Sequence, residues 1–326
     1  MNRKGENLML KQASSIHTIS APGKNSFIKY LKQEYLLYLI MVPGILYFVI
    51  FKYIPMYGVT IAFQDYNIFN PGSSTFVGLE NFKKLFVQVG FQRALVNNII
   101  ISLQKLLVGF PIPIILSLMI NEIRSRHYKK FVQTAVILPN FVSWVVINGL
   151  MFALFSPNMG GIKHVADLIG YTGEIPNILS NKDTFRSVIL WTHIWKHAGM
   201  GTIVYLAALM SIDPQLYEAA SIDGAGSWKR LIHVTLPGIR STIIVLLMFR
   251  VGEVMNAGFD QIFAITNPIV NPVADIIDTF VYRMGMQSKQ FSIATAAGLF
   301  KSVIGLLLVL GTNTVAKKID PDSKMI

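Results

Sequence analysis

Apart from Lys52, which is close enough to the end of its apolar stretch to reach the membrane surface, six charged residues lie within long apolar stretches of the sequence, where a charge is costly unless it has a partner or a task. Such residues usually face the interior of a helical bundle and mark the path of a polar solute. Four of them are basic and two acidic, which predicts a path that favours an anionic solute. The six are Lys105, Lys196, Arg250, Glu253, Asp260 and Lys301.

Two pairs of polar residues within the apolar stretches have the spacing for other kinds of chemistry. His193 and His197, at positions i and i+4, could supply half of a metal site. No acidic residue lies near them and Lys196 lies between them, so we interpret them as hydrogen-bonded bundle residues and predict no metal site. Arg250 and Glu253, at i and i+3, predict an internal ion pair.

Paired carboxylates would be needed for a membrane-embedded enzyme, such as a glycan transferase. Asp275 and Asp278 are the candidates in the connections between apolar stretches. We interpret them as polar positions on an external helix, and we predict no catalytic residue.

Composition indicates an integral membrane protein. The chain has 326 residues, of which 52% are hydrophobic and 14% charged, against about 25% charged in a soluble domain. Mean hydropathy is +0.50. There is no cysteine, which excludes disulfides, thiolate metal sites and cysteine nucleophiles. A net charge of +12 would suit a nucleic-acid-binding protein. The positions of the basic residues along the chain test that possibility.

Six stretches approach the roughly 20 apolar residues that a bilayer requires, which predicts an all-α polytopic membrane protein with six transmembrane helices. The first is too long for the core of a signal peptide and lacks a small-residue cleavage site, so we expect it to be retained. The expected spans are 36–58, 95–120, 132–155, 187–210, 241–265 and 292–315.

Basic residues in the connections predict the orientation. Segments 1–34, 121–131, 211–240 and 316–326 hold 16 Lys and Arg, whereas segments 59–94, 156–186 and 266–291 hold 8. This asymmetry places both termini in the cytoplasm, and it accounts for the basic charge without nucleic acid. The domain organisation we expect is a basic tail at 1–34, the first span with an external interfacial helix near 76–86 within 35–94, a core at 95–318, and a tail at 319–326.

The inner segment 211–240 is longer than a connection between two spans requires. Asp213 suits a helix N-cap and Pro214 the first helical position. Gly224 and Gly226 end that helix, and a second helix is expected over 227–235. The result is a helix–turn–helix at the cytoplasmic surface, which either receives a partner close to Glu218 or merely caps the bundle.

The sequence EAASIDGA at 218–225, followed by Leu236 and Pro237, resembles the EAA loop of permease subunits in bacterial binding-protein-dependent ABC importers. The resemblance implies a type I permease core over 95–318. It also implies that the loop is a coupling helix, which docks in a cleft of an ATPase subunit. The residues implied in coupling are Glu218, Ala219, Ala220, Asp223, Gly224 and Ala225.

The resemblance extends over nearly the whole chain. FVGLENFKKLF at 76–86 is similar to the stretch after the first span of sugar-importer permeases. GFDQI at 258–262, IDTFVYR at 277–283 and AGLFKS at 297–302 resemble the branch that handles complex or polysaccharide-derived oligosaccharides, which includes alginate importers. The glycine-rich segment of many simple-sugar members is replaced here by TNPIV at 266–270, which favours the same branch.

The chain contains no G-x-x-x-x-G-K-[ST] phosphate-binding loop, so we predict that it is not an ATPase and holds no cofactor of its own. The resemblance implies two partner ATPase subunits that bind ATP and magnesium, and an external solute-binding protein that delivers an oligosaccharide. It also implies a second permease subunit, which we expect to be a paralogue. The location implied is the bacterial cytoplasmic (inner) membrane.

A different class of protein, a self-contained secondary transporter or channel for a polar solute, would also explain charges within the spans. It would not explain a coupling-loop motif in a 30-residue inner segment, and no inverted repeat is visible in the sequence.

Overall fold

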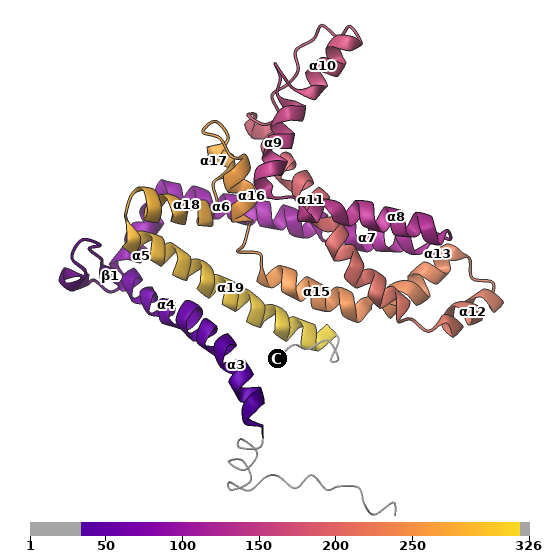
Figure 1. Cartoon of the computed structure of the whole chain (residues 1–326), viewed down its shortest axis with the longest axis horizontal. Helices are drawn as coiled ribbons and strands as arrows, with labels where there is room; N and C mark the ends of the chain where they lie inside the picture. Colours follow the sequence, from indigo (N-terminus) through magenta and orange to yellow (C-terminus); the bar gives the residue numbers. More distant parts are fainter. Residues whose placement is uncertain (1–33, 320–326) are drawn as a thin grey trace, which may run out of the picture. The chain divides into compact units, whose positions relative to one another are not determined.

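The computed structural model describes residues 34–319, which are helical apart from their connections and one pair of two-residue strands. The chain divides into two compact units, residues 1–58 and 59–326, and each is described by itself. Figure 1 gives the order of the elements along the chain. Apart from Glu34 and Ile319, the basic tails predicted at 1–34 and 319–326 lie outside the described residues.

The described residues of the first unit form one helical segment, made of α3 (Tyr35–Phe48), the π-helical turn η1 (Val49–Tyr53) and α4 (Ile54–Met56). Apolar side chains surround α3 on every side, and none of them is buried. A helix that is apolar all round is typical of a membrane span. Tyr35–Phe63, of 29 residues, is long and apolar enough to cross a bilayer, as expected for 36–58.

The second unit contains the remaining elements. The division falls within η2 (Tyr57–Phe63), which is followed by the antiparallel strands β1 (Gln64–Asp65) and β2 (Thr75–Phe76), with η3 (Pro71–Ser73) between them, and by α5 (Glu80–Val87). Then follow α6 (Val89–Gln104), η4 (Lys105–Gly109), α7 (Pro111–Asn121), α8 (Arg126–Ile137), η5 (Leu138–Phe141), α9 (Trp144–Phe155), α10 (Gly161–Leu168) and α11 (Lys182–Met210). The chain continues through α12 (Pro214–Ile222), α13 (Ser227–Arg230), η6 (Leu231–Thr235), α14 (Leu236–Gly238), α15 (Arg240–Gly252), α16 (Phe259–Ile265), α17 (Asn271–Ala274), α18 (Ile277–Tyr282), η7 (Arg283–Gln287) and α19 (Phe291–Ile319).

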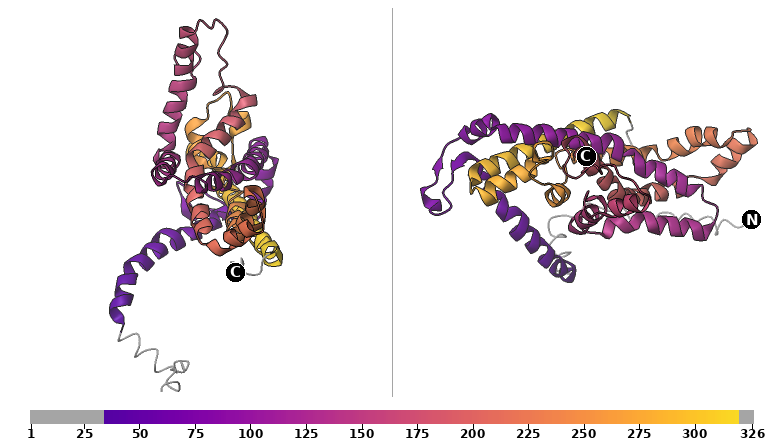
Figure 2. Two further views of the ribbon diagram at one scale, coloured as in Figure 1. Left: turned by 90° about the vertical axis from the view of Figure 1, so that its right-hand side faces the viewer. Right: turned by 90° about the horizontal axis from the view of Figure 1, so that it is seen from above.

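Three apolar clusters form the core of this unit. The first joins α5, α6, α18 and α19, where the ring of Phe91 lies 5.6 Å from that of Phe280. The second joins α6, α11, α16 and α17 around Ile189 and Ile262. The third joins α7 and α11 to the start of α15 around Leu206 and Ile239. α11 belongs to the second and third clusters and α6 to the first and second, so these two helices link the three clusters. Figure 2 shows the ribbon in two further views.

The structure confirms a helical membrane protein and changes the description of its spans. Three helical segments in residues 34–319 are long and apolar enough to cross a membrane, and two bent helix pairs raise the count to five if each is one span. The expected span at 187–210 lies within α11, whose 29 residues reach about 44 Å at 1.5 Å per residue. α11 is not among the helices that are long and apolar enough to cross a membrane, so the count of six stays a prediction.

Two of the expected spans are not continuous helices, and that part of the prediction is wrong. The helices of the span expected at 132–155 are bent by 102° between Phe141 and Trp144. The span expected at 241–265 is interrupted after Gly252, and α16 starts only at Phe259. Gly258 adopts a φ of +97°, a conformation that favours glycine and that sets the new helix direction.

The external helix expected at 76–86 begins at Glu80 and packs into the unit. Asn81 is 4% exposed, and its amide donates hydrogen bonds to the backbone oxygens of Ala62 at 3.0 Å and Gln64 at 2.9 Å. These bonds join α5 to the chain that leads into it, so the segment is more than an amphipathic surface helix.

Candidate coupling loop and translocation cavity

The inner loop adopts the helix–turn–helix that its residues predict. The side chain of Asp213 caps α12 by accepting from the backbone N–H of Gln215 at 2.9 Å, and Pro214 is the first helical residue. The helix ends at Gly224, whose φ is +74°. The N–H of Ala225 then donates to the oxygen of Ala220 at 2.9 Å, closing a glycine C-cap.

Two side-chain contacts hold the loop to the following helix. The hydroxyl of Tyr217 lies 3.1 Å from that of Thr235, and the guanidinium of Arg230 donates to the hydroxyl of Ser221 at 3.1 Å. The outward side presents Glu218, Ala219 and Asp223 as exposed residues, while Ala220 and Ala225 are half-buried. Ile222 and Trp228 are also exposed, at 86% and 72%. This surface combines an acid, small side chains and uncovered apolar groups, which are the features of a protein-binding surface.

A cavity of about 430 Å³ lies between η4, α7, α11 and α15. Tyr205 and Phe249 line it together with glycine and proline backbone, and two of its buried hydroxyls, those of Ser102 and Tyr205, have no hydrogen-bond partner in the described residues. Its polar and charged lining residues are Ser102, Lys105, His193, His197, Tyr205, Arg250, Glu253 and Asn256.

Three of the six charged residues predicted for a translocation path line this one cavity. Lys105 enters from the first residue of η4, and π-helical turns of this kind occur frequently at functional sites. Arg250 and Glu253 enter from the end of α15 with their charged groups 3.6 Å apart, which confirms an ion pair but not the internal position expected for it. Both are exposed, so the pair is a loose one.

The other three do not line this cavity, and two of them, Lys196 and Lys301, have polar partners elsewhere. Lys196 is buried and donates to the backbone oxygens of Asn140, at 2.8 Å, and Val142, at the bend between α8 and α9. Lys301 donates to Asp278 at 2.5 Å. Asp260 is exposed on α16 and is not among the residues that line the cavity.

The two histidines lie close together on α11. Their ring centroids are 4.8 Å apart, and Nδ1 of His197 lies 3.2 Å from the side-chain oxygen of Asn140. Both face the same cavity, where they add hydrogen-bonding groups between Lys105 and Arg250.

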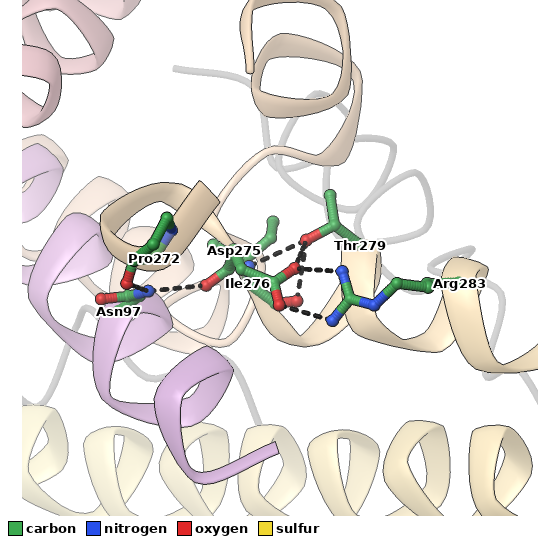
Figure 3. Close-up of polar contacts among 6 residues, drawn as sticks. All are labelled: Asn97, Pro272, Asp275, Ile276, Thr279 and Arg283. Carbon is green, nitrogen blue, oxygen red and sulfur yellow. Dashed lines mark hydrogen bonds and ion pairs between the residues drawn. The ribbon is translucent and has the colours of Figure 1, made fainter. Parts of the chain in front are cut away.

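Asp278 lies on the helix α18, whereas Asp275 precedes that helix and is buried, so the interpretation as a polar position on a helix is wrong for Asp275. Figure 3 shows Asp275 between Thr279 and Arg283. Its side chain is 4% exposed and accepts from both terminal nitrogens of Arg283, at 3.0 and 2.6 Å. The hydroxyl of Thr279 accepts from the backbone N–H of Ile276 at 2.8 Å, which caps α18. Asp278 is tied to Lys301, so both acids hold α18 in place.

Sequence reasoning missed the amides that join these elements. The amide of Asn97 donates to the backbone oxygens of Pro272 and Asp275, both at 3.1 Å, and accepts from Arg186 at 2.8 Å. Gln261 is 1% exposed and joins Lys105 to α11. Each of these amides lies in an otherwise apolar stretch of the sequence. Because a buried amide needs hydrogen-bond partners, this position could have marked them as contacts between helices.

The helical spans, the polar cavity between them and the exposed inner loop define a transport permease. Residues 109–322 match the family described as binding-protein-dependent transport system inner membrane component. The chain belongs to this family, and is therefore a multi-pass inner-membrane permease subunit of an ABC transporter. Such subunits do not hydrolyse ATP and carry no cofactor. A self-contained secondary transporter or channel is thereby excluded.

Relatives cover nearly the whole chain. It is 46% identical over 298 residues to Protein LplB of Bacillus subtilis (strain 168), covering 91% of this chain and 93% of that one. It is 43% identical over 296 residues to the polygalacturonan/rhamnogalacturonan transport system permease protein YteP of the same organism, covering 90% and 91%.

Solved structures give the same fold. A chain of a bacterial ABC transporter involved in the import of the acidic polysaccharide alginate superposes with a TM-score of 0.82 at 41% identity, covering 90% of this chain and 99% of that chain. A second structure, of a bacterial alginate ABC transporter in complex with an alginate pentasaccharide-bound periplasmic protein, gives 0.81 at 41% identity, covering 89% and 97%. These matches confirm the type I importer fold and the branch that the sequence motifs resemble.

Proposed function

We propose that this permease subunit moves anionic oligosaccharides, built from uronic acid units, from a solute-binding protein into the cytoplasm. The observation that carries the proposal is the cationic cavity. Lys105 and Arg250 line it against one acid, Glu253, which leaves an excess of positive charge, while His193 and His197 add hydrogen-bonding groups. A confined site with excess positive charge attracts an anionic solute and repels cations.

The relatives support the same class of cargo. Polygalacturonan and rhamnogalacturonan, named for one relative, and alginate, named for the transporters of known structure, are acidic polysaccharides. Because this chain is 41–43% identical to these proteins over most of its length, we propose a cargo of the same chemical class.

We infer the assembly of the transporter from the coupling loop. Six spans place both termini and α12 on the cytoplasmic side, where Glu218, Ala219 and Asp223 meet an ATPase subunit. Gly224 and Ala225 shape the end of the helix, and Ala220 supports it. Two ATPase subunits, a second permease of different sequence and an external binding protein complete the transporter. Closure of the ATPases draws the coupling helices together and opens the cavity outward.

Glu218→Ala is expected to uncouple the transporter. Because Glu218 is exposed on α12, its loss leaves the fold intact and removes a charged contact from the docking surface. We expect at least a fivefold fall in cargo-stimulated ATP hydrolysis, or in recovery of the ATPase with the tagged permease, about 1 kcal/mol at 1.4 kcal/mol per tenfold.

The matched control is Glu122→Ala, which removes another exposed glutamate from the connection between α7 and α8. Equal recovery and equal turnover for Glu218→Ala, Glu122→Ala and the unchanged chain would show that Glu218 makes no functional contact with an ATPase.

Arg250→Gln tests the charge of the cargo. Removing this cation is expected to raise the KM for trigalacturonate by about tenfold, equivalent to about 1.4 kcal/mol, with less than a twofold change for the carboxyl-reduced, neutral analogue. Uptake is measured in proteoliposomes that contain the complete transporter and its binding protein. Each value is divided by that of the unchanged transporter for the same cargo, so that the preference of the binding protein cancels. An equal change for both cargoes would contradict the proposal that the cargo is anionic.

A further inference from the structure

Gln261 is held in one orientation by α11. Its side-chain nitrogen donates to the backbone oxygen of Ile189 at 2.6 Å and to the hydroxyl oxygen of Thr192 at 2.8 Å. A backbone oxygen can only accept, and the hydroxyl of Thr192 donates its own proton to Val188 at 2.7 Å. The amide nitrogen therefore must face α11, and the amide oxygen must face the opposite way.

The amide oxygen of Gln261 meets the ammonium group of Lys105. Nζ of Lys105 donates to this oxygen at 2.6 Å and to the backbone oxygen of Ala257 at 2.7 Å. Both acceptors are neutral, and none of the ion pairs within residues 34–319 includes Lys105. An ammonium has three N–H groups. Two fix its position, its charge is not cancelled, and the third remains for a group in the cavity that Lys105 lines.

The backbone at the start of α16 is shaped around the same ammonium. At Gly258, where φ is +97°, a Cβ atom would lie 3.1 Å from Nζ of Lys105. Any side chain there would be strained by the backbone conformation and would crowd the ammonium. The segment GFDQI thus supplies both the space for Lys105, at Gly258, and its acceptor, at Gln261.

We propose that Gln261 is the positioning residue that makes Lys105 the anion-selecting cation of the cavity. Gln261 binds the ammonium through a neutral oxygen, so the positive charge of Lys105 remains available to bind a carboxylate of the cargo. A carboxylate side chain at position 261 would neutralise that charge. The inference rests on the proposed function and adds the residue that sets its charge selectivity. Gln261 acts through Lys105 and touches no cargo itself.

Gln261→Glu tests the proposal with an almost isosteric change. In the complete transporter, with trigalacturonate and its neutral carboxyl-reduced analogue as probes, we expect the KM for the anionic probe to rise at least tenfold. The KM for the neutral probe is expected to change less than twofold, relative to the unchanged transporter in each case. Gln290→Glu adds the same charge at an exposed glutamine away from the cavity and is expected to change neither value.

Gln261→Met serves if the glutamate variant does not assemble, since it keeps the length of the side chain and removes the acceptor. It is expected to raise the anionic KM by about threefold, because Ala257 still holds the ammonium. A double-mutant cycle adds the decisive comparison. In a Lys105→Met background, the substitutions at Gln261 are expected to leave the ratio of the two KM values unchanged.

Three outcomes would overturn the inference. Equal effects on both probes in an assembled transporter would make Gln261 a packing residue. An undiminished effect of the Gln261 substitutions without Lys105 would show that Gln261 acts on something else. In both cases the cargo proposal stands, provided that Arg250→Gln and Lys105→Met discriminate between the probes. An unchanged transporter that does not take up trigalacturonate would overturn the cargo proposal together with this inference.

Discussion

Gly199→Ala is expected to prevent the close packing of α11 against α8 and to destabilise the permease severely. A Cβ atom at position 199 would lie 2.0 Å from the backbone oxygen of Val136 and 2.4 Å from its carbonyl carbon. These are backbone atoms of α8, so the helices themselves would have to separate. Small residues allow this kind of approach between membrane helices, and overpacking costs about 1–3 kcal/mol even where side chains can adjust.

The measurement is the midpoint of thermal unfolding of the purified transporter in detergent, together with the yield of the assembled complex. Gly298→Ala is the matched control, because a Cβ atom at that position of α19 would meet no atom within 4 Å beyond its chain neighbours and the backbone of its own helix. Alanine is the better helix former by up to about 1 kcal/mol, so we expect that variant to be as stable as the unchanged chain or more stable. Similar midpoints for the two variants would refute the packing argument.

Asp275→Ala is expected to produce the second large loss of stability. Its carboxylate accepts two hydrogen bonds from Arg283 and one from Thr279, and it is almost completely buried. Removing one partner of a buried ion pair leaves the other charge without compensation, at a cost of about 3–5 kcal/mol. Arg283 is 32% exposed and regains some water, so we expect a loss of about 2–3 kcal/mol.

Limited proteolysis of the external connection and thermal unfolding would both report this loss. Asp260→Ala is the control, since it removes an exposed aspartate on the nearby helix α16. Its effect is expected to stay within about 0.5 kcal/mol, as for most surface substitutions. If Asp275→Ala unfolds at the same temperature as Asp260→Ala, the buried pair does not hold α18 in place.

The sequence was most informative where the relevant interactions are local. The boundaries of α12 follow from Asp213, Pro214 and Gly224, because an N-cap, a first-turn proline and a glycine C-cap each act within a few residues. The helical membrane class follows from apolar length alone. Both predictions needed no knowledge of which helices pack together.

The site was predicted only in part, because its contacts join distant parts of the chain. Lys105 and Lys196 look alike in the sequence, as single lysines in apolar stretches. Lys105 is bound 156 residues away by Gln261 and faces a cavity, whereas Lys196 is bound 56 residues away by Asn140 at a helix bend. The bend itself is not visible in the hydropathy pattern, so the role of Lys196 could not be separated from that of Lys105 by spacing.

The same two lysines pose different problems while the chain is being made. The oxygens that receive Lys196 belong to residues 140 and 142, so they are already synthesised when this lysine emerges from the ribosome. The oxygens that receive Lys105 belong to residues 257 and 261, at least 152 residues later. At 5–20 residues per second, roughly 8–30 s of translation separate this charge from its acceptors. The helix that carries Lys105 is therefore made well before its acceptors, and its final position is reached only when residues 257–261 have been synthesised.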